Sequence, residues 1–364
     1  MTALRPATEA ELAEAIRSAE APLAIRGGGT RPVGVPSNAR VLETGGLSGI
    51  RLYEPGALTL VVGAGTPLAE VEAAVASERQ RLPFEAPDWG PLLEAPGQST
   101  IGGVVAANAS GPRRVQAGAC RDSLIGVRFM DGRGTIVKNG GRVMKNVTGY
   151  DLVKLMAGSW GTLGVLTEVA FKLLPAAPAQ ATLTLPDLGP AEAVAALTAA
   201  LGSPYDISGA GWLPGAGAMV RVEGLEGSVE HRGAALRRLL APFGRVEAGA
   251  PGLWRDLAEG RPFHGRAGDL WRFNLRPSTA PALIAALAPH LASPVALDWG
   301  GGLVWALLAE GADPRSLPIQ GHATRMRGPG AGAFPPEPAG VARLAAGLRA
   351  RFDPRGILNP GRMG

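Results

Sequence analysis

Three glycine-rich segments are the parts of this 364-residue chain best suited to chemistry. They are RGGGT at 26–30, GQSTIGGVVAANASG at 97–111 and GSWGTLG at 158–164. Without Cβ atoms, successive backbone N–H groups can converge on an anionic oxygen, and nearby serine and threonine hydroxyls can donate to it. The segments therefore indicate phosphate binding. For segment 97–111 taken alone, close packing between helices is an equally good explanation of the small residues.

Regular elements must position these segments. Residues 23–25 predict a short buried strand that runs directly into the first glycines. Residues 104–109 predict a tightly packed helix, whose N-terminal amides would face the same anion as Ser99 and Thr100. Residues 165–173 predict a strand that begins at the third segment. Three such junctions in one folding unit favour an extended nucleotide cofactor.

The first segment does not match two common phosphate-binding motifs. A Rossmann turn opens a helix, but Pro32 and Pro36 follow these glycines and prevent a regular helix. A Walker loop ends in Gly-Lys-Ser/Thr, which is absent after Gly29. The anion site must therefore belong to another fold.

Helix signals flank the first two segments. Thr8 and Glu11 have the spacing of a capping box, and apolar residues at helical spacing then predict a helix over 9–19. Thr66, followed by proline, predicts the N-cap of a helix over 67–78.

Composition bounds the class of protein. A hydrophobic content of 46% with 18% charged residues is typical of a globular chain. The apolar runs are too short to span a bilayer, and residues 1–20 do not resemble a secretory signal, so we expect a cytoplasmic protein.

Cys120 is the only cysteine, which excludes an intrachain disulfide and a cysteine-ligated iron–sulfur cluster. The net charge of +5 is spread without a basic cluster, so we expect no nucleic-acid binding; a basic surface is equally suited to an acidic substrate or an acidic partner subunit.

The second half predicts a different kind of unit. Strands are expected over 181–185, 205–212, 218–222, 245–248, 269–275, 295–298 and 303–308, and helices near 190–201, 229–240 and 280–291. Earlier, 124–129 and 134–137 flank Asp131-Gly132 and predict a hairpin. The order indicates an α+β fold whose second half is an antiparallel, ferredoxin-like sheet with helices on one face.

The three segments, together with FDPRGILNPGRM near the C-terminus, resemble the FAD-binding fold shared by vanillyl-alcohol oxidase and p-cresol methylhydroxylase. The resemblance implies a p-cresol methylhydroxylase-type FAD domain over 1–175 and a smaller cap over 176–335. A helix over 339–351 and the tail, together 336–364, would return to the FAD domain.

The same resemblance implies which residues hold the cofactor. The pyrophosphate and ribityl contacts would come from Arg26, Gly27, Gly28, Gly29, Thr30, Pro96, Gly97, Gln98, Ser99, Thr100, Gly102 and Gly103. The flavin would lie near Asn108, Ser110 and Gly111, and the adenosine half near Gly161, Thr162, Gly164 and Val165. Many relatives carry a flavin-linked histidine beside the first loop; this chain has none there, so we expect non-covalent FAD.

Motifs in the second half, including Trp271-Arg272, 298–301, Trp305 and 321–325, resemble the E subunits of bacterial glycolate oxidases. The resemblance implies a complex with two other components, a larger FAD-containing D subunit and an iron–sulfur F subunit. Any membrane association would come through that complex. Trp299 and Trp305 are equally consistent with core aromatic residues.

Oxidation of a small 2-hydroxy acid needs a cation for the carboxylate, a base for the hydroxyl proton and a flavin as hydride acceptor. His322 and Arg325 are the candidate pair, with Arg272 as a further cation, although a lone histidine near an arginine is more often structural. The resemblance implies that full-length relatives which oxidise 2-hydroxy acids carry a paired-histidine metal motif in a larger cap. This chain has no His-x-His or His-x-x-x-His spacing, so we expect no metal, and the absence argues against autonomous catalysis. Three interpretations stay open: an FAD-binding subunit of a glycolate oxidase complex whose dehydrogenation site is in its partner, a stand-alone 2-hydroxy acid dehydrogenase, and a non-catalytic scaffold. The intact glycine segments argue against the scaffold.

Overall fold

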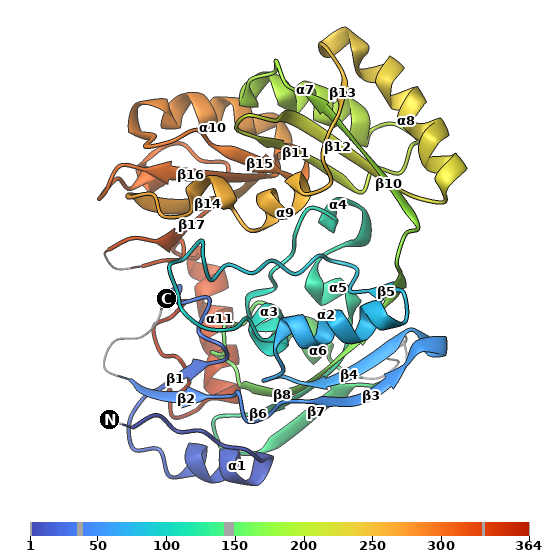
Figure 1. Cartoon of the computed structure of the whole chain (residues 1–364). Helices are drawn as coiled ribbons and strands as arrows, with labels where there is room; N and C mark the ends of the chain where they lie inside the picture. Colours follow the sequence, from blue (N-terminus) through green and yellow to red (C-terminus); the bar gives the residue numbers. More distant parts are fainter. Residues whose placement is uncertain (1, 35–38, 142–148, 330–331, 364) are drawn as a thin grey trace.

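The chain folds into two α+β units stacked one above the other (Figure 1). The computed structural model describes residues 2–34, 39–141, 149–329 and 332–363, so Pro36 lies outside the described residues. The lower unit is built from the N-terminal half, and the upper unit from the second half. The α+β fold class expected from the sequence is confirmed.

The lower unit is organised around an antiparallel five-stranded sheet. Across this sheet the strands run β3 (Ile50–Glu54), β4 (Thr59–Gly63), β8 (Val165–Lys172), β6 (Leu124–Met130) and β7 (Ile136–Gly140). The predicted hairpin is the β6–β7 pair. Two smaller pairs complete the unit: parallel β1 (Leu23–Arg26) with β2 (Arg40–Glu43), and antiparallel β5 (Gln80–Arg81) with β9 (Leu174–Pro175).

The N-termini of two helices in the lower unit can be compared with those predicted from local sequence. Helix α1 (Glu9–Arg17) begins as predicted, because the Thr8 hydroxyl accepts a hydrogen bond from the Glu11 N–H at 3.1 Å. Helix α2 (Leu68–Ser77) begins one residue later than predicted, with Pro67 at the N-cap. The Thr66 hydroxyl is used elsewhere, since it donates to the Gly63 carbonyl and accepts from the Gly49 N–H.

Four further helices of this unit are short. They are α3 (Ile101–Ala107), α4 (Arg114–Ala117), α5 (Cys120–Ser123) and α6 (Leu152–Met156). Thr100 caps α3, which therefore begins three residues earlier than the predicted 104–109.

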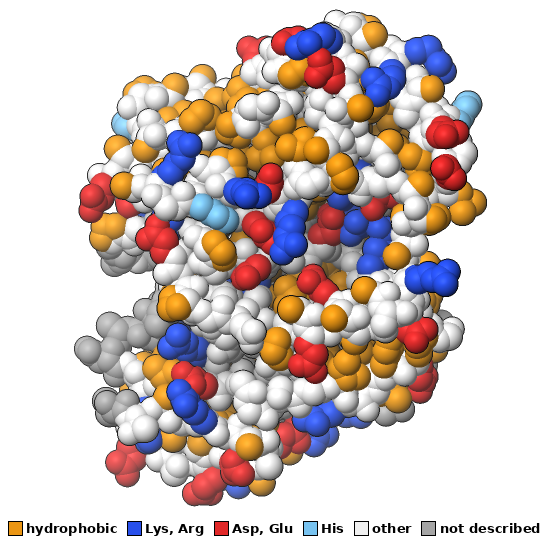
Figure 2. Space-filling model, in the orientation of Figure 1, with side chains coloured by type: hydrophobic (Ala, Val, Ile, Leu, Met, Phe, Trp, Pro, Cys, Tyr) orange, Lys and Arg blue, Asp and Glu red, His pale blue; other side chains and the backbone are white. Residues whose placement is uncertain are grey.

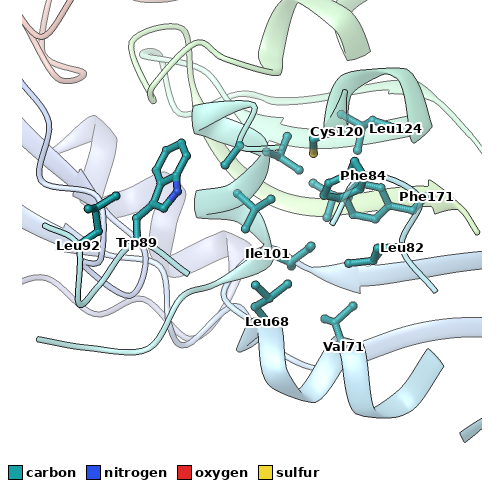
Figure 3. Close-up of a cluster of buried hydrophobic side chains, with 14 of the residues drawn as sticks. Leu68, Val71, Leu82, Phe84, Trp89, Leu92, Ile101, Cys120, Leu124 and Phe171 are labelled. Carbon is teal, nitrogen blue, oxygen red and sulfur yellow. The ribbon is translucent and has the colours of Figure 1, made fainter. Parts of the chain in front are cut away.

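A buried apolar cluster joins α2 and α3 to the sheet (Figure 3). Leu68 rises from α2 toward Ile101 of α3, and the rings of Phe84 and Phe171 lie 5.7 Å apart. Trp89 stands to one side of this cluster, on the loop that leads toward the upper unit. Each such buried side chain contributes about 1.5–3 kcal/mol relative to an exposed one.

The upper unit is an eight-stranded antiparallel sheet made of two ferredoxin-like halves. Its strands run β13 (Glu247–Ala248), β10 (Ala179–Leu185), β12 (Gly217–Gly224), β11 (Gly209–Leu213), β15 (Ala296–Asp298), β16 (Leu303–Leu308), β14 (Asp269–Leu275) and β17 (Gly321–Arg327). The first half contains β10 to β13 and the second half β14 to β17. Counted from its outer edge, each half has its fourth strand first, then its first, third and second strands, so the halves meet where β11 pairs with β15. The sequence did not predict β17, a mostly polar edge strand.

Helices cover both faces of the upper sheet, not one as the sequence indicated. The outer face carries α7 (Pro190–Leu201), α8 (Glu226–Leu240) and α10 (Ala280–Leu287) (Figure 1). The inner face carries α9 (Leu253–Ala258), whose Trp254 and Leu257 belong to the same apolar cluster as the lower unit. This helix is short, so its apolar residues do not show a helical period.

The C-terminal segment packs against the lower unit. Helix α11 (Ala339–Phe352) ends beside β6, with the rings of Phe352 and Phe129 5.9 Å apart. The tail then pairs with β1: Leu358 bridges Leu23, and the Asn359 side chain accepts from the Ile25 N–H at 2.8 Å. Residues from the two ends of the sequence thereby meet at the end of β1.

Candidate functional site

The three glycine-rich segments meet around one cavity of about 400 Å³ in the lower unit. The end of β1, the start of α3 and residues 159–164 supply its walls. The first and second segments lie against each other so closely that side chains would not fit. A Cβ on Gly28 would lie 1.4 Å from the Gln98 carbonyl oxygen, and one on Gly97 2.0 Å from the Gly28 carbonyl oxygen. The glycines are therefore required by the contact between the loops as well as by access to their backbone.

Donor groups of the cavity are only partly used within the protein. The Ser159 hydroxyl is buried and has no hydrogen-bond partner among the described residues. The Thr100 side chain caps α3 by accepting from the Gly103 N–H at 3.3 Å. An orphaned hydroxyl beside a glycine cradle is the arrangement that a phosphate oxygen would complete, so these residues fit the pyrophosphate of FAD.

Arg31 is a buried cation on the cavity wall that the sequence did not single out. Its guanidinium donates to the Ser99 hydroxyl at 2.9 Å and to the Pro87 carbonyl at 2.6 Å, while its Nε has no partner among the described residues. Burial lowers the pKa of Arg31 to about 10, which still leaves it charged at neutral pH. It is a second group that an anionic ligand would satisfy.

Arg362 reaches the same cavity from the C-terminal tail. Its guanidinium donates to the backbone carbonyls of Val33 and Arg31, each at 3.0 Å, and lies 5.1 Å from the centre of the Trp160 ring. The only sequence signal for this residue was its place in the C-terminal motif. The tail thus fixes the loop that carries the first glycines.

The structure sorts the residues predicted to hold the cofactor into two groups. The cavity is lined by Arg26, Gly27, Gly28, Gly29, Thr30, Pro96, Thr100, Gly102, Gly103, Gly161 and Gly164. Gly97, Gln98, Ser99, Asn108, Ser110, Gly111, Thr162 and Val165 do not line it.

The three residues predicted near the flavin make hydrogen bonds within the protein, and their place near the flavin stays a prediction. The Asn108 side chain accepts from the Arg121 N–H, and the Ser110 hydroxyl accepts from the N–H of Cys120, a buried thiol. The Gly111 carbonyl accepts from the Trp299 indole at 3.1 Å. Gly111 therefore joins the lower unit to the upper one, at the end of segment 97–111.

The predicted pair His322 and Arg325 is not brought together. Both lie on β17, but the strand register puts them on opposite faces: His322 is opposite Asn274, and Arg325 is opposite Trp271. Neither lines the cavity. Arg325 lies 5.8 Å from the centre of the Trp271 ring, beside a second, wider cleft of about 1050 Å³ between β17 and the tail. The register of an unpredicted strand could not be read from the sequence.

A buried ion network lies between the two units, where charged side chains of both signs gather at the waist of the molecule (Figure 2). Arg113 donates to Glu223 of β12 through two hydrogen bonds, at 2.8 and 2.9 Å. Arg221 of the same strand pairs with Glu85 of the lower unit at 2.8 Å. Sequence reasoning missed these pairs because their members are far apart in the chain, at separations of 110 and 136 residues.

A metal site needs a cluster of ligand side chains, and a membrane span needs a long apolar helix. Among the described residues, no cluster of three or more histidine, cysteine, aspartate or glutamate side chains could hold a metal ion. Within that same part of the chain, no helix is both long enough and apolar enough to span a bilayer.

Comparisons with known proteins agree with this geometry. A family model described as FAD binding domain matches residues 2–140. The chain is 38% identical over 352 residues to the glycolate oxidase subunit GlcE of Escherichia coli, which covers 95% of this chain and 93% of that protein. It is 33% identical over 195 residues to an uncharacterized FAD-linked oxidoreductase of Mycobacterium tuberculosis, covering 50% and 40% of the two chains.

A shorter match involves the glycolate oxidase subunit GlcD of Bacillus subtilis, with 44% identity over 85 residues, or 23% of this chain and 18% of that protein. Among solved structures, an alkyldihydroxyacetonephosphate synthase superposes with a TM-score of 0.67 and 16% identity, covering 98% of this chain and 76% of that one. At this identity the structural match concerns the fold alone.

Proposed function

Because the chain belongs to the family of the glycolate oxidase subunit GlcE and binds FAD, we propose that it is the FAD-binding subunit of a glycolate-oxidising complex. In this complex glycolate is oxidised to glyoxylate, and the electrons pass through the flavin to the other subunits. The observation that carries the proposal is the cavity formed by the three glycine-rich segments. The 38% identity to the Escherichia coli subunit, over an alignment that covers 95% of this chain, supports the same function.

Each part of the cavity has a proposed task. The backbone amides of 27–30, the Ser159 hydroxyl and Arg31 would hold the pyrophosphate, and Gly161 and Gly164 would leave room for the adenosine half. Arg362 would keep the first loop in place through its two carbonyl contacts. When bound, FAD supplies a two-electron acceptor at the flavin N5. Among the described residues no histidine lines the cavity, so we propose that FAD binds non-covalently.

Two arrangements of the chemistry are compatible with this role. In the first, a larger FAD-containing D subunit carries the dehydrogenation site, an iron–sulfur F subunit accepts electrons, and this chain transfers electrons or organises the assembly. The similarity to both GlcE and GlcD supports this arrangement. In the second, the chain oxidises a small 2-hydroxy acid itself. The separation of His322 and Arg325 weighs against their acting as a pair in that case.

A visible absorption spectrum of the purified chain tests the proposal. After reconstitution with FAD, we expect the oxidised-flavin bands, and acid precipitation should release the chromophore into the supernatant. A chain that shows no flavin bands after reconstitution would contradict the cofactor assignment and favour a scaffold role.

Anaerobic addition of glycolate to the FAD-loaded chain then separates the two arrangements, with acetate as the control because it has no hydroxyl group. Bleaching by glycolate but not by acetate identifies a dehydrogenase in its own right. Bleaching only after the D and F subunits are added assigns the dehydrogenation to the partner. Persistent oxidised flavin in the assembled complex would refute glycolate oxidation.

A further inference from the structure

Arg272 is an arginine enclosed by tryptophans at the inner face of the upper sheet. Its guanidinium carbon lies 5.9, 5.4 and 5.9 Å from the ring centres of Trp89, Trp299 and Trp305. Trp305 is its direct cross-strand neighbour in β16, so both side chains face the lower unit. The Arg272 Nε is buried without a partner, and the side chain makes no hydrogen bond or ion pair with any described residue.

A second arginine from the other unit approaches the same indole. Arg114, the first residue of α4, lies with its guanidinium carbon 4.3 Å from the centre of the Trp299 ring. Within the described part of the chain its side chain also has no hydrogen bond and no ion pair. Two cations without a hydrogen-bond or ion-pair partner among the described residues thus lie against one ring. Placing like charges together in a partly buried site is costly unless an anion joins them.

The nearby acid Asp298 does not supply that anion at neutral pH. Asp298 immediately precedes Trp299, and the one hydrogen bond that its side chain accepts from a described residue comes from the Trp299 N–H, at 2.7 Å. Burial raises the pKa of Asp298 to about 8, so the carboxyl is mostly protonated at pH 7. The pair of arginines therefore keeps its positive charge.

An unusual backbone conformation fixes the indole at this point. Trp299 has φ +55°, and Gly300 and Gly301 follow with φ +68° and +101°. A tryptophan in the left-handed region is strained, and the contact that fixes it here is the hydrogen bond from its indole to the Gly111 carbonyl. Gly111 ends the segment predicted to lie near the flavin.

The site also adjoins the FAD cavity. The ring centre of Trp89 lies 5.9 Å from the Arg272 guanidinium carbon and 5.4 Å from that of Arg31, which lines the cavity. Arg272, Arg114 and Trp299 each keep partial solvent exposure.

We propose that Arg114 and Arg272, which both contact the Trp299 ring, form a carboxylate-binding site across the interface of the two units. Its ligand is the carboxylate of a small 2-hydroxy acid, so this inference rests on the proposed function. Guanidinium groups bind carboxylates through paired, charge-assisted hydrogen bonds, and the surrounding indoles exclude water that would weaken them.

Oxalate is the probe, because it carries carboxylates but has no hydroxyl-bearing carbon to oxidise. Titrated into the full FAD-loaded chain, it should change the tryptophan fluorescence saturably, since three of the seven tryptophans surround the site. Arg272→Gln and Arg114→Gln should each weaken oxalate binding by roughly 10- to 100-fold. Arg276→Gln is the matched control, because Arg276 is exposed just beyond the end of β14 and should leave binding unchanged.

Two further measurements keep the test decisive if a glutamine variant does not fold. Arg272→Lys keeps the charge but loses the planar fork, and should bind oxalate with intermediate affinity. In the wild-type chain, the neutral diamide oxamide should give no saturable change. Equal binding of oxalate and oxamide, or wild-type oxalate affinity in a folded Arg272 variant, would overturn the proposal.

The outcome is separable from that of the proposed function. Oxalate binding that requires Arg272, in a chain whose assembled complex does not oxidise glycolate, keeps the carboxylate site and rejects the reaction. Glycolate oxidation that proceeds with an unchanged KM in Arg272→Gln keeps the reaction and rejects the site.

Discussion

Arg113 of the lower unit and Glu223 of the upper unit form a two-pronged ion pair, with Nε–Oε2 and Nη2–Oε1 distances of 2.8 and 2.9 Å. Glu223 also accepts from Arg81 at 2.8 Å, and the neighbouring Arg221 pairs with Glu85. The network holds three arginines and two glutamates, so each carboxylate is needed to compensate buried positive charge. This arrangement ties the sheet of one unit to the loops of the other.

Glu223→Gln should destabilise the chain by about 3 kcal/mol at pH 7, because it leaves buried arginines without their carboxylate. Urea unfolding followed by circular dichroism measures this. Asp187→Asn, which removes an exposed partner of Arg245, is the control and should have a much smaller effect, because solvent screens the charges of an exposed pair. Equal effects of the two substitutions would refute the structural role of the network.

The pH dependence of the same variant gives a second prediction. Burial pushes the pKa of Glu223 upward, but the hydrogen bond from Arg113 and the charges of Arg113, Arg221 and Arg81 outweigh it and lower the pKa to about 2. The ion-pair stability is therefore present above pH 4.5 and lost as the pH falls from about 4.5 to 2. Unfolding curves between pH 7 and pH 3 should show a loss for the wild type that is smaller for Glu223→Gln.

Gly28→Ala should abolish FAD binding, because its Cβ would lie 1.4 Å from the Gln98 carbonyl oxygen and force the two loops apart. Flavin absorbance retained after gel filtration measures the loss. Gly56→Ala is the matched control, since nothing lies within 4 Å of a Cβ there and it should keep its flavin. A Gly28 variant that retains stoichiometric FAD would contradict the described contact.

Arg362→Met should weaken FAD binding by about tenfold while leaving most of the fold intact, because it removes the contacts to the Val33 and Arg31 carbonyls. Fluorescence titration of the apoprotein with FAD gives the Kd. Arg343→Met, on the exposed face of α11, should bind FAD as the wild type does. If both variants bind equally, Arg362 does not position the loop.

Asp298→Asn tests the raised pKa of that carboxyl. Burial raises the pKa from 3.8 to about 8, against the lowering effects of the Trp299 N–H and the charges of Arg221 and Arg272; Glu85 adds to the rise. The folded state therefore binds more protons than the unfolded state between about pH 4 and pH 8, and the wild type loses stability as the pH rises through this window.

Asp298→Asn should lack this component, so its unfolding free energy should decline less between pH 5 and pH 8.5. Thermal unfolding of both proteins across that range provides the measurement. Parallel pH profiles would show that Asp298 is already ionised in the folded protein.

Elements with strong local signals could be predicted from the sequence. Helix α7 and strands β14 and β16 have the predicted bounds, because their signals are local: a proline at the helix start, alternating apolar residues in β14 and a continuous apolar run in β16. Strand β17 was missed because GHATRMR carries no such pattern and is held by pairing with β14. The predicted N-cap at Thr66 was wrong, because the Thr66 hydroxyl instead donates to the carbonyl of Gly63, at the end of β4, and accepts from the Gly49 N–H.

The glycine segments, and the phosphate-binding role that they indicate, can be predicted from the amino-acid order, because backbone N–H groups without neighbouring Cβ atoms can converge on an anion. The FAD fold was implied by the resemblance of these segments to a known family. Which charged side chains meet is settled by long-range packing instead. The way the two units and the C-terminal tail pack pairs Arg113 with Glu223. It also brings the Arg362 side chain to the Arg31 carbonyl, and Arg114 and Arg272 to one tryptophan ring. Such pairings depend on the register of strands and the stacking of the two units, and no local spacing in the chain records either.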